Sequence, residues 1–407
     1  MDLKPFFFLD QKKSPLFLAQ LLVFILNILG YSIVFPLFQT PQSPFFSDLL
    51  ENQPLIVGAL IGLYGLGQLI GVLLCKKLET HFSCRFVILS TFGSFIVGQI
   101  VILVGLLNPS LEIIFLGRFL SGIGSGNIKL IFQKLHREHI FVAQNHLLTF
   151  LFSIAAMSLF LGPWIGASLG QIEVFSGGGG LLAIILLGIV DSVFLFLYLK
   201  KLPNKSSKDP FWIHLFKELI FIFVVKHHRK GIFRFILFSA GWILCLSSIP
   251  YFFSTKFGIA FKGMGDIYSF LFVTWFFGTV FLHPELSAKI SNRSLIYTSI
   301  WLLAFGMFLI VFTPQLWTFW ILIPVVGFCG AIAWAESFNS YKFLNLQPLE
   351  MSVIGIVFYV WGLVEALTPL IPIFYQRIDP GTGLFLSACF FFFLACLVTF
   401  YRFKLRA

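Results

Sequence analysis

The stretch FVILSTFGSFIVGQIVILVGLL, residues 86–107, decides the fold of this chain. It contains no charged side chain, and its length suits one helix across the ~30 Å hydrocarbon core of a bilayer. A helix satisfies its own backbone hydrogen bonds, which an open sheet cannot do in lipid. We therefore predict that this stretch is a transmembrane helix.

Apolar stretches of similar length precede and follow it along the whole chain. The predicted spans are 16–38, 54–75, 86–107, 111–133, 147–169, 180–199, 232–254, 266–283, 294–313, 316–338, 352–374 and 382–402. An even number of spans places both termini on the same side of the membrane. The pattern predicts an all-α integral membrane protein with twelve transmembrane helices.

Positive charge lies almost entirely on one side of this predicted topology. Of the 28 Lys and Arg residues, 23 fall on the side of the termini, 3 fall on the other side, and Arg118 and Lys129 fall within a span. By the positive-inside rule the termini are cytoplasmic, and we expect a multi-pass protein of the cell inner (plasma) membrane. Juxtamembrane cations that face anionic lipid also account for the net charge of +11, so no nucleic-acid partner is implied.

Composition supports the same class of protein. The chain is 58% hydrophobic and 11% charged, and it has no polar stretch long enough for a globular domain. Its 6 Cys residues form no C-x-x-C pair, so neither a disulfide framework nor a zinc site is indicated, and we expect no cofactor. No small-residue cleavage site accompanies the first span, which is expected to be retained.

The spans divide into two halves. We predict a six-helix bundle over residues 1–200, a cytoplasmic linker over 201–231 and a second six-helix bundle over 232–407. Within the linker, Asp209-Pro210 is a good helix start, because a capping acid precedes a proline at the first helical position. The apolar run that follows either forms an interfacial helix along the inner leaflet or extends the seventh span.

A faint internal repeat supports this division. The connection after span two reads LETHFSCR, residues 78–85, and the connection after span eight reads LSAKISNR, residues 286–293. Both fit L-x-x-x-[FI]-S-x-R at an offset of six spans. The repeat predicts two halves of related structure.

Span five contains SLFLGPWIGASLG, residues 158–170. Gly162, Gly166 and Gly170 are spaced by four and form one smooth helix face, while Pro163 permits a bend. This stretch resembles the antiporter motif of the major facilitator superfamily, within its twelve-span drug/proton antiporter-like (TetA-like) group. The resemblance implies two six-helix halves related by pseudo-two-fold symmetry, and a hinge role for these residues.

Span four contains LGRFLSGIGSGN, residues 116–127, which is similar to the arginine motif of that superfamily. Arg118 and Lys129 share one helix face about 16 Å apart, with Gly122 and Gly126 close to it. A cation within a membrane usually faces a cavity or a partner, so we expect Arg118 in the substrate pathway together with Asn127. Lys129 lies near the cytoplasmic end, where snorkelling explains it.

The connection between spans two and three departs from the superfamily. Members usually show a glycine-led loop with an aspartate and paired basic residues, which acts as a cytoplasmic gate latch. Here Lys76 replaces the leading glycine, Thr80 the aspartate and Ser83 the second glycine, and only Arg85 is kept. Arg85 is therefore the one candidate gate residue in this loop.

Three acidic residues lie within spans. Glu365 lies well inside span eleven, Glu336 lies nearer the cytoplasmic end of span ten, and Asp191 lies near the middle of span six. A buried carboxyl can bind a proton on one side of a membrane and release it on the other, and Glu365 is the best placed. The resemblance implies a packing or oligomer role for Asp191. Glu336 is a further candidate for the substrate and proton pathway, and the alternative is that it reaches water. Further polar residues that either line a cavity or join helices are Asn27, Gln68, Gln99 and Asn339.

These observations favour transport over catalysis. The chain has no H-E-x-x-H, P-loop or G-x-S-x-G motif, and no metal-ligand spacing. We predict a secondary active transporter that moves a small organic solute, of the drug, metabolite or siderophore type, by alternating access with a proton as coupling ion. Export is favoured by the span-five motif, and a monomer is expected. The alternatives are an uptake permease for a nutrient such as an amino acid, and a non-transporting membrane protein of the same fold.

Overall fold

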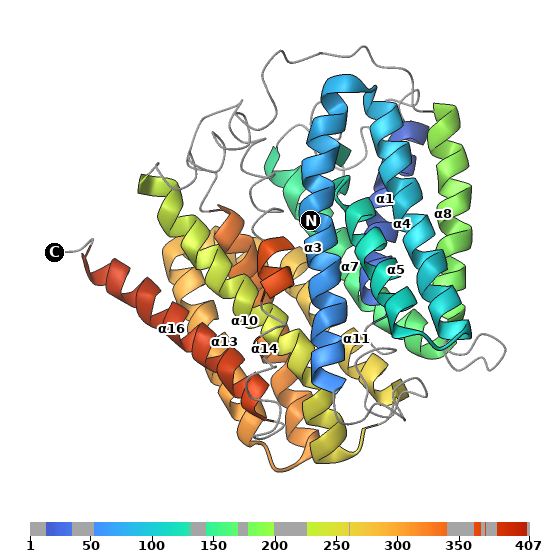
Figure 1. Cartoon of the computed structure of the whole chain (residues 1–407). Coiled ribbons are helices and arrows are strands. Elements are labelled where there is room, and N and C mark those ends of the chain that lie inside the picture. The colour runs from blue at the N-terminus through green and yellow to red at the C-terminus, as the bar shows by residue number, and fades with distance from the viewer. Residues whose placement is uncertain are drawn as a thin grey trace.

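The structure, a computed structural model, describes residues 14–34, 53–128, 130–131, 144–169, 178–198, 226–259, 261–339, 362–367, 371 and 381–404. Within these residues the long regular elements are all helices (Figure 1). The first half contains α1 (Ser14–Ser32), α3 (Gln53–His81), α4 (Cys84–Leu107), α5 (Leu111–Ser125), α7 (Gln144–Leu169) and α8 (Gly179–Tyr198). The second half contains α10 (Lys226–Phe257), α11 (Phe261–Phe277), η4 (Gly278–Leu282), α12 (His283–Lys289), α13 (Asn292–Phe312), α14 (Leu316–Asn339) and α16 (Thr382–Lys404).

The described helices coincide with the predicted spans, and residues 362–367 are helical within predicted span eleven. Several boundaries differ. Helix α3 continues to His81, because lysines at a helix end extend to water without breaking the helix. Helix α5 ends at Ser125, a turn follows at 126–127, and the described residues 128 and 130–131 of the predicted span 111–133 are helical again. Helix α10 begins at Lys226, inside the predicted linker, whose residues 201–225 lie outside the described part of the chain.

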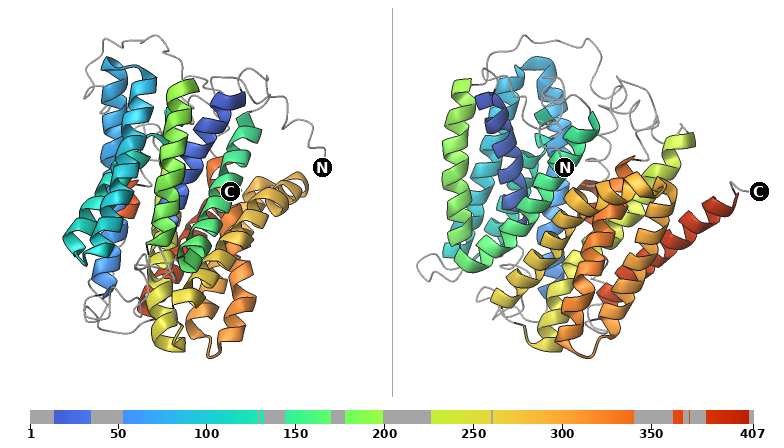
Figure 2. Two further views of the ribbon diagram at one scale, coloured as in Figure 1. Left: turned by 90° about the vertical axis from the view of Figure 1, so that its right-hand side faces the viewer. Right: turned by 180° about the vertical axis from the view of Figure 1, so that it is seen from behind.

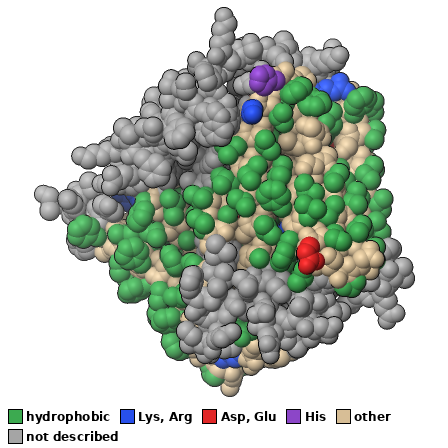
Figure 3. Space-filling view, in the orientation of Figure 1, with side chains coloured by type: hydrophobic (Ala, Val, Ile, Leu, Met, Phe, Trp, Pro, Cys, Tyr) green, Lys and Arg blue, Asp and Glu red, His purple; other side chains and the backbone are tan. Residues whose placement is uncertain are grey.

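The outer surface suits a lipid environment. Eight of the described helices are long and apolar enough to cross a membrane, and two shorter apolar helices, Leu18–Ser32 and Ile154–Leu169, accompany them. In Figure 3 hydrophobic side chains cover most of the described surface, and few ionisable side chains are visible. Helix α8 is an example, since Phe196 is 61% exposed and Leu197 is 67% exposed. In water such surfaces would be unfavourable, whereas in acyl chains they are not.

Each half has its own packed core. In the first half, α5 packs against α3 and α4, while α8 packs against α1 and α4. In the second half, α13 packs against α14 and α16, while α10 packs against α16 and α11 against α14. The main contact between the halves joins α7 to α11, and α3 touches α10 (Figure 2). These packing relations place the boundary between the two halves beside α3, α7, α10 and α11.

Close backbone contacts define this boundary. A Cβ atom at Gly265 of α11 would lie 2.3 Å from the Cβ atom of Ala167 and 3.1 Å from the carbonyl oxygen of Pro163, both in α7. On the other side, a Cβ atom at Gly62 of α3 would lie 3.0 Å from the carbonyl oxygen of Ala366. In Figure 1 α3 and α10 approach each other at their lower ends and diverge toward their upper ends. The described helices of the two halves thus meet toward one end of the molecule.

The internal repeat has a structural counterpart in both halves. Ser83 accepts a hydrogen bond from the backbone N–H of Phe86 at 3.3 Å and caps α4, and Ser291 accepts one from the N–H of Ser294 at 3.4 Å and caps α13. The turns before them also match. The N–H of Phe82 donates to the carbonyl of Leu78, and the N–H of Ile290 donates to the carbonyl of Leu286, each at 2.8 Å. The serine of the repeat is therefore a helix N-cap in both halves.

Candidate functional site

A cluster of charged and aromatic side chains lies at the boundary between the halves. Arg118 of α5 is 1% exposed, and the centre of its guanidinium group lies 4.7 Å from the ring centroid of Tyr64 and 5.6 Å from that of Tyr31. The two rings, from α1 and α3, lie 4.8 Å apart. Such cation–π contacts compensate part of the cost of burying the cation.

The Arg118 side chain also has unused hydrogen-bonding capacity. Its Nε donates to the backbone carbonyl of Leu60 at 3.4 Å. Its Nη1 is buried and has no hydrogen-bond partner in the described structure. A guanidinium group prefers to have its donors satisfied, so this nitrogen is available to an acceptor that enters the site.

Glu365 belongs to the same cluster and comes from the second half. Its side chain is 1% exposed and interacts through a hydrogen bond with the Tyr31 side chain, and its charge interacts with that of Arg118. Tyr31 links the two, since its ring lies beside the Arg118 guanidinium group and its side chain shares a hydrogen bond with Glu365. Glycine makes the approach possible, because a Cβ atom at Gly65 of α3 would lie 2.7 Å from the Cβ atom of Glu365.

The glycines of span four explain how Arg118 reaches this position. A Cβ atom at Gly122 would lie 2.2 Å from the carbonyl oxygen of Tyr64, and one at Gly126 would lie 2.2 Å from the carbonyl carbon of Gly71. Helix α5 is therefore in backbone contact with α3, which holds Arg118 under the Tyr64 ring. The predicted glycine stripe thus serves to pack α5 onto α3.

The polar residues expected in spans are buried and mostly join helices. The Asn27 side chain of α1 donates to the Asn127 side chain at 3.1 Å, and the Gln99 side chain of α4 donates to the Ser121 hydroxyl of α5 at 3.1 Å. Gln68 is 5% exposed on α3. Nothing is described for the side chain of Asn339, and Lys129 lies outside the described residues. The hydrogen bond between Asn27 and Asn127 therefore joins two segments inside the first half.

Glu336, which the sequence placed near the water interface, is buried. It is 2% exposed, and its Oε1 lies 2.8 Å from Nε2 of His283, which is 8% exposed. The two residues come from α14 and from the start of α12. The reading in which Glu336 reaches water is wrong for this structure, because packing of α12 against α14 encloses its carboxyl group.

Asp191 is also enclosed. It is 0% exposed although its neighbours on α8 face outward, and neither carboxylate oxygen has a hydrogen-bond partner in the described structure. Helix α8 packs against α1 and α4, so this carboxyl group points into the first half. A direct role in an oligomer contact, which the resemblance implied, does not fit this position.

The span-five glycines lie inside the first half. A Cβ atom at Gly162 would lie 2.0 Å from the hydroxyl oxygen of Ser32, and one at Gly166 would lie 2.1 Å from the carbonyl oxygen of Ile33. Both contacts are with the end of α1, namely its last residue and the residue that follows it. The face of α7 that touches the second half instead contains Pro163 and Ala167. Gly170 lies outside the described residues.

Arg85 also makes its contacts within the first half. Its guanidinium group lies 4.6 Å from the ring centroid of Phe196 and donates a hydrogen bond to the carbonyl of the same residue. These contacts join the start of α4 to the end of α8. In this structure Arg85 therefore joins α4 to α8 within the first half, and no described contact connects it to the second half.

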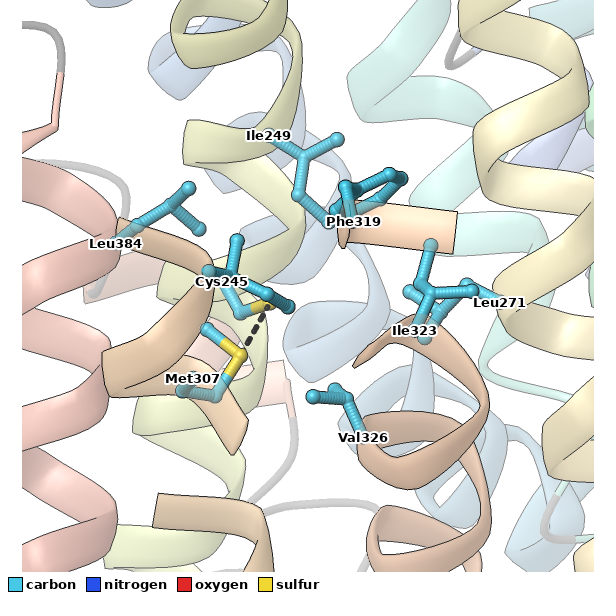
Figure 4. A pocket seen from close by; sticks show the side chains of 9 residues that line it. Cys245, Ile249, Leu271, Met307, Phe319, Ile323, Val326 and Leu384 are labelled. Carbon is cyan, nitrogen blue, oxygen red and sulfur yellow. Dashed lines mark hydrogen bonds between the residues drawn. The ribbon is translucent and has the colours of Figure 1, made fainter. Parts of the chain in front are cut away.

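One small cavity lies in the core of the second half and not at the boundary (Figure 4). Its lining is wholly apolar: Cys245, Ile249, Leu271, Met307, Ile310, Phe319, Ile323, Val326 and Leu384. The sulfur atoms of Cys245 and Met307, which are neighbours in this lining, lie 3.8 Å apart. Because it offers no charged group, this cavity is a packing feature of the half-bundle. Within the described residues no group of three His, Cys, Asp or Glu side chains suits a metal ion.

Sequence reasoning missed four residues of these sites: Tyr31, Tyr64, Gly265 and His283. A tyrosine or glycine in a long apolar helix is too common to stand out. His283 carried a signal, since an ionisable side chain inside a predicted span is unusual.

Comparison with known proteins agrees with this architecture. The sequence profile of the Major Facilitator Superfamily matches residues 16–369. The crystal structure of the human organic anion transporter MFSD10 (TETRAN) is similar with a TM-score of 0.71 at 14% identity, covering 95% of this chain and 99% of that chain. The structure of the POT family transporter PepTSo is similar with a TM-score of 0.71 at 13% identity, covering 97% of this chain and 98% of that chain. The structure of the nucleoside transporter NupG is similar with a TM-score of 0.68 at 14% identity, covering 94% of this chain and 98% of that chain. No curated protein sequence matches the chain.

Proposed function

The chain belongs to the Major Facilitator Superfamily, and we propose that it is a proton-coupled secondary active transporter that moves a small organic solute by alternating access. Family and fold make it a multi-pass membrane protein and a transporter rather than an enzyme. The solute, the coupling ion and the direction of transport belong to the proposal.

The observation that carries the proposal is the cluster of Arg118, Tyr31, Tyr64 and Glu365. It brings a cation from the first half and a carboxyl group from the second half into one buried site. A site at the boundary between repeats is where a carrier of this architecture binds its solute. Movement of the halves would change the surroundings of both charges, which is what coupling requires.

In this mechanism Glu365 carries the proton and Arg118 holds the solute. When the halves separate on one side, water reaches Glu365 and its proton exchanges; when they close, burial favours the neutral carboxyl group. The Tyr31 side chain interacts with both Glu365 and Arg118, so a change in the charge of the carboxyl group alters the surroundings of Arg118. Solute binding and proton binding are thereby linked through shared neighbours.

Topology and direction complete the proposal. The charge distribution supports cytoplasmic termini in the cell inner membrane. With that orientation, the end at which the described halves meet is the outer end. Export by proton antiport is favoured by the resemblance of residues 158–170 to the antiporter motif.

The test uses the purified protein in liposomes that contain a pH-sensitive dye. A panel of organic anions, organic cations, nucleosides and peptides is added under an imposed pH gradient. At least one class is expected to cause a proton flux that empty liposomes lack, and Arg118→Ala should abolish it. A matched control is Glu285→Gln, which removes only an exposed carboxylate paired with Lys289.

The sign of the flux decides between mechanisms. Proton movement opposite to the solute indicates antiport, and movement with the solute indicates symport and therefore uptake. Solute flux without any proton flux would contradict the coupling. The absence of flux for every class, including the solutes to which a deletion strain becomes sensitive, would favour a non-transporting protein.

A further inference from the structure

The unused donor of Arg118 indicates what kind of group the solute presents to it. The side chain is 1% exposed, and its Nη1 is enclosed without a hydrogen-bond partner in the described structure. An unpaired buried donor is unfavourable, and the cost is larger when the donor is charged. The site therefore favours a solute group that accepts a hydrogen bond from Nη1.

The helices around Arg118 provide no counter-charge of their own. Helices α1 and α4 contain no acidic side chain, and neither do residues 53–75 of α3. The one acidic side chain of α5 is Glu112, which lies exposed in the first turn. The carboxyl group whose charge reaches Arg118 is Glu365, which comes from the second half. The balance of charge at this site therefore depends on Glu365.

An anionic solute replaces this balance when Glu365 is neutral. In the proposed cycle Glu365 takes up a proton and loses its charge, whereas a guanidinium group keeps its charge in proteins. A cation without a counter-charge inside a membrane is expensive. A carboxylate on the solute supplies a negative charge, and its two oxygens suit the planar set of N–H donors of arginine.

A second unused group lies one helical turn from the Tyr64 position. Gln68 follows Tyr64 by four residues on α3, so it lies on the same helix face about 6 Å further along. It is 5% exposed, and its Oε1 is buried without a hydrogen-bond partner. Gly65, three residues earlier, faces Glu365, which places Gln68 at the boundary between the halves. Its carbonyl oxygen suits an O–H or N–H group.

We propose that the solute is an organic carboxylate that also has a hydrogen-bond donor, such as a hydroxyl group. This inference rests on the proposed function and adds the class of solute to it. The carboxylate accepts a hydrogen bond from Nη1 of Arg118, and the hydroxyl group donates one to Oε1 of Gln68. The inference concerns the solute that binds, and the sign of the proton flux decides the direction in which it moves.

The first test measures binding to the purified full-length protein and needs no transport. Its four probes differ only in the two groups of interest: 4-hydroxybenzoate, benzoate, 4-hydroxybenzamide and benzamide. We expect 4-hydroxybenzoate to bind most tightly. Benzoate should bind about 2- to 10-fold more weakly, and 4-hydroxybenzamide about 10- to 100-fold more weakly, because a hydrogen bond to a charged group is the stronger one. Amides that bind as tightly as the carboxylates, or carboxylates that do not bind at millimolar concentration, would overturn the proposal.

Variants assign the two contacts separately. Arg118→Gln should remove the preference for 4-hydroxybenzoate over 4-hydroxybenzamide, and Gln68→Leu should remove the preference for 4-hydroxybenzoate over benzoate. Each variant should keep the other preference. The control Glu285→Gln, which changes an exposed carboxylate, should bind all four probes as wild type does. A wild-type preference for the carboxylate in Arg118→Gln would show that this residue does not bind the anion.

The comparison of the four probes on the unmodified protein remains decisive if the variants fold poorly. It also separates this inference from the proposed function. Carboxylate binding without any proton or solute flux would contradict the proposed function and leave the anion site standing. Transport of a solute of another class, together with the absence of carboxylate binding, would overturn the inference and leave the proposed function standing.

Discussion

Substitution of Gly265 by alanine tests the contact between the halves. The new Cβ atom would lie 2.3 Å from the Cβ atom of Ala167, whereas non-bonded carbons prefer about 3.5–4.0 Å, so α7 and α11 must separate by about 1 Å at this point. Overpacking of this kind costs about 1–3 kcal/mol. Only the arrangement in which these helices touch suffers this cost. We therefore expect its population relative to the opposite arrangement to fall by about 5- to 150-fold.

Spin labels near the end of α7 and the start of α11 measure this shift as a longer mean distance. Two glycines serve as controls. Gly166→Ala clashes with the carbonyl oxygen of Ile33 at 2.1 Å inside one half, and we expect loss of stability without a change in the distance between halves. A Cβ atom at Gly93 would have no neighbouring atom within 4 Å, so Gly93→Ala should change neither the stability nor the distance between the halves. An unchanged distance in Gly265→Ala, with a loss of stability like that of Gly166→Ala, would refute this reasoning.

Three further predictions concern topology, the arginine and the repeat. A cysteine at Lys205 should react with an impermeant thiol reagent only from the cytoplasmic side, and labelling from outside intact cells would overturn the charge argument. Arg118→Lys should retain little of the solute-dependent proton flux of the wild type, because lysine lacks the planar set of guanidinium donors. A flux equal to that of the wild type would show that a positive charge at this position is enough for transport. Ser83→Ala and Ser291→Ala should each lower the stability of their half by about 0.5–2 kcal/mol, measured by thermal unfolding, and a loss in only one would deny the equivalence of the caps.

The fold was largely predictable because the membrane imposes simple rules. Length and hydropathy located the helices, and the repeat around Ser83 and Ser291 predicted two related halves. Helix ends were less predictable. The predicted span two ends at residue 75, before Lys76 and Lys77, yet α3 runs on to His81, since the long lysine side chains reach water from within a helix.

The partners of the site residues were not predictable from single positions. The sequence indicated Arg118 and Glu365 because charge in a span is rare, but it gave no reason to join them to Tyr31 and Tyr64. That assembly depends on backbone approach at Gly65 and similar positions, which only the packed structure defines. The span-five glycines illustrate the same limit, because their spacing predicted a close helix contact without indicating that the partner is α1.

The most direct test of the account compares Glu365→Gln with wild type in proteoliposomes, using the first solute that gives a proton flux. Solute accumulation driven by the pH gradient and solute exchange at equal pH are measured on the same preparations. The account predicts that the variant loses gradient-driven accumulation but keeps exchange, because the amide can still accept a hydrogen bond from Tyr31 but cannot carry a proton. Accumulation at the wild-type rate with the wild-type pH dependence would contradict the assignment of the coupling proton to Glu365.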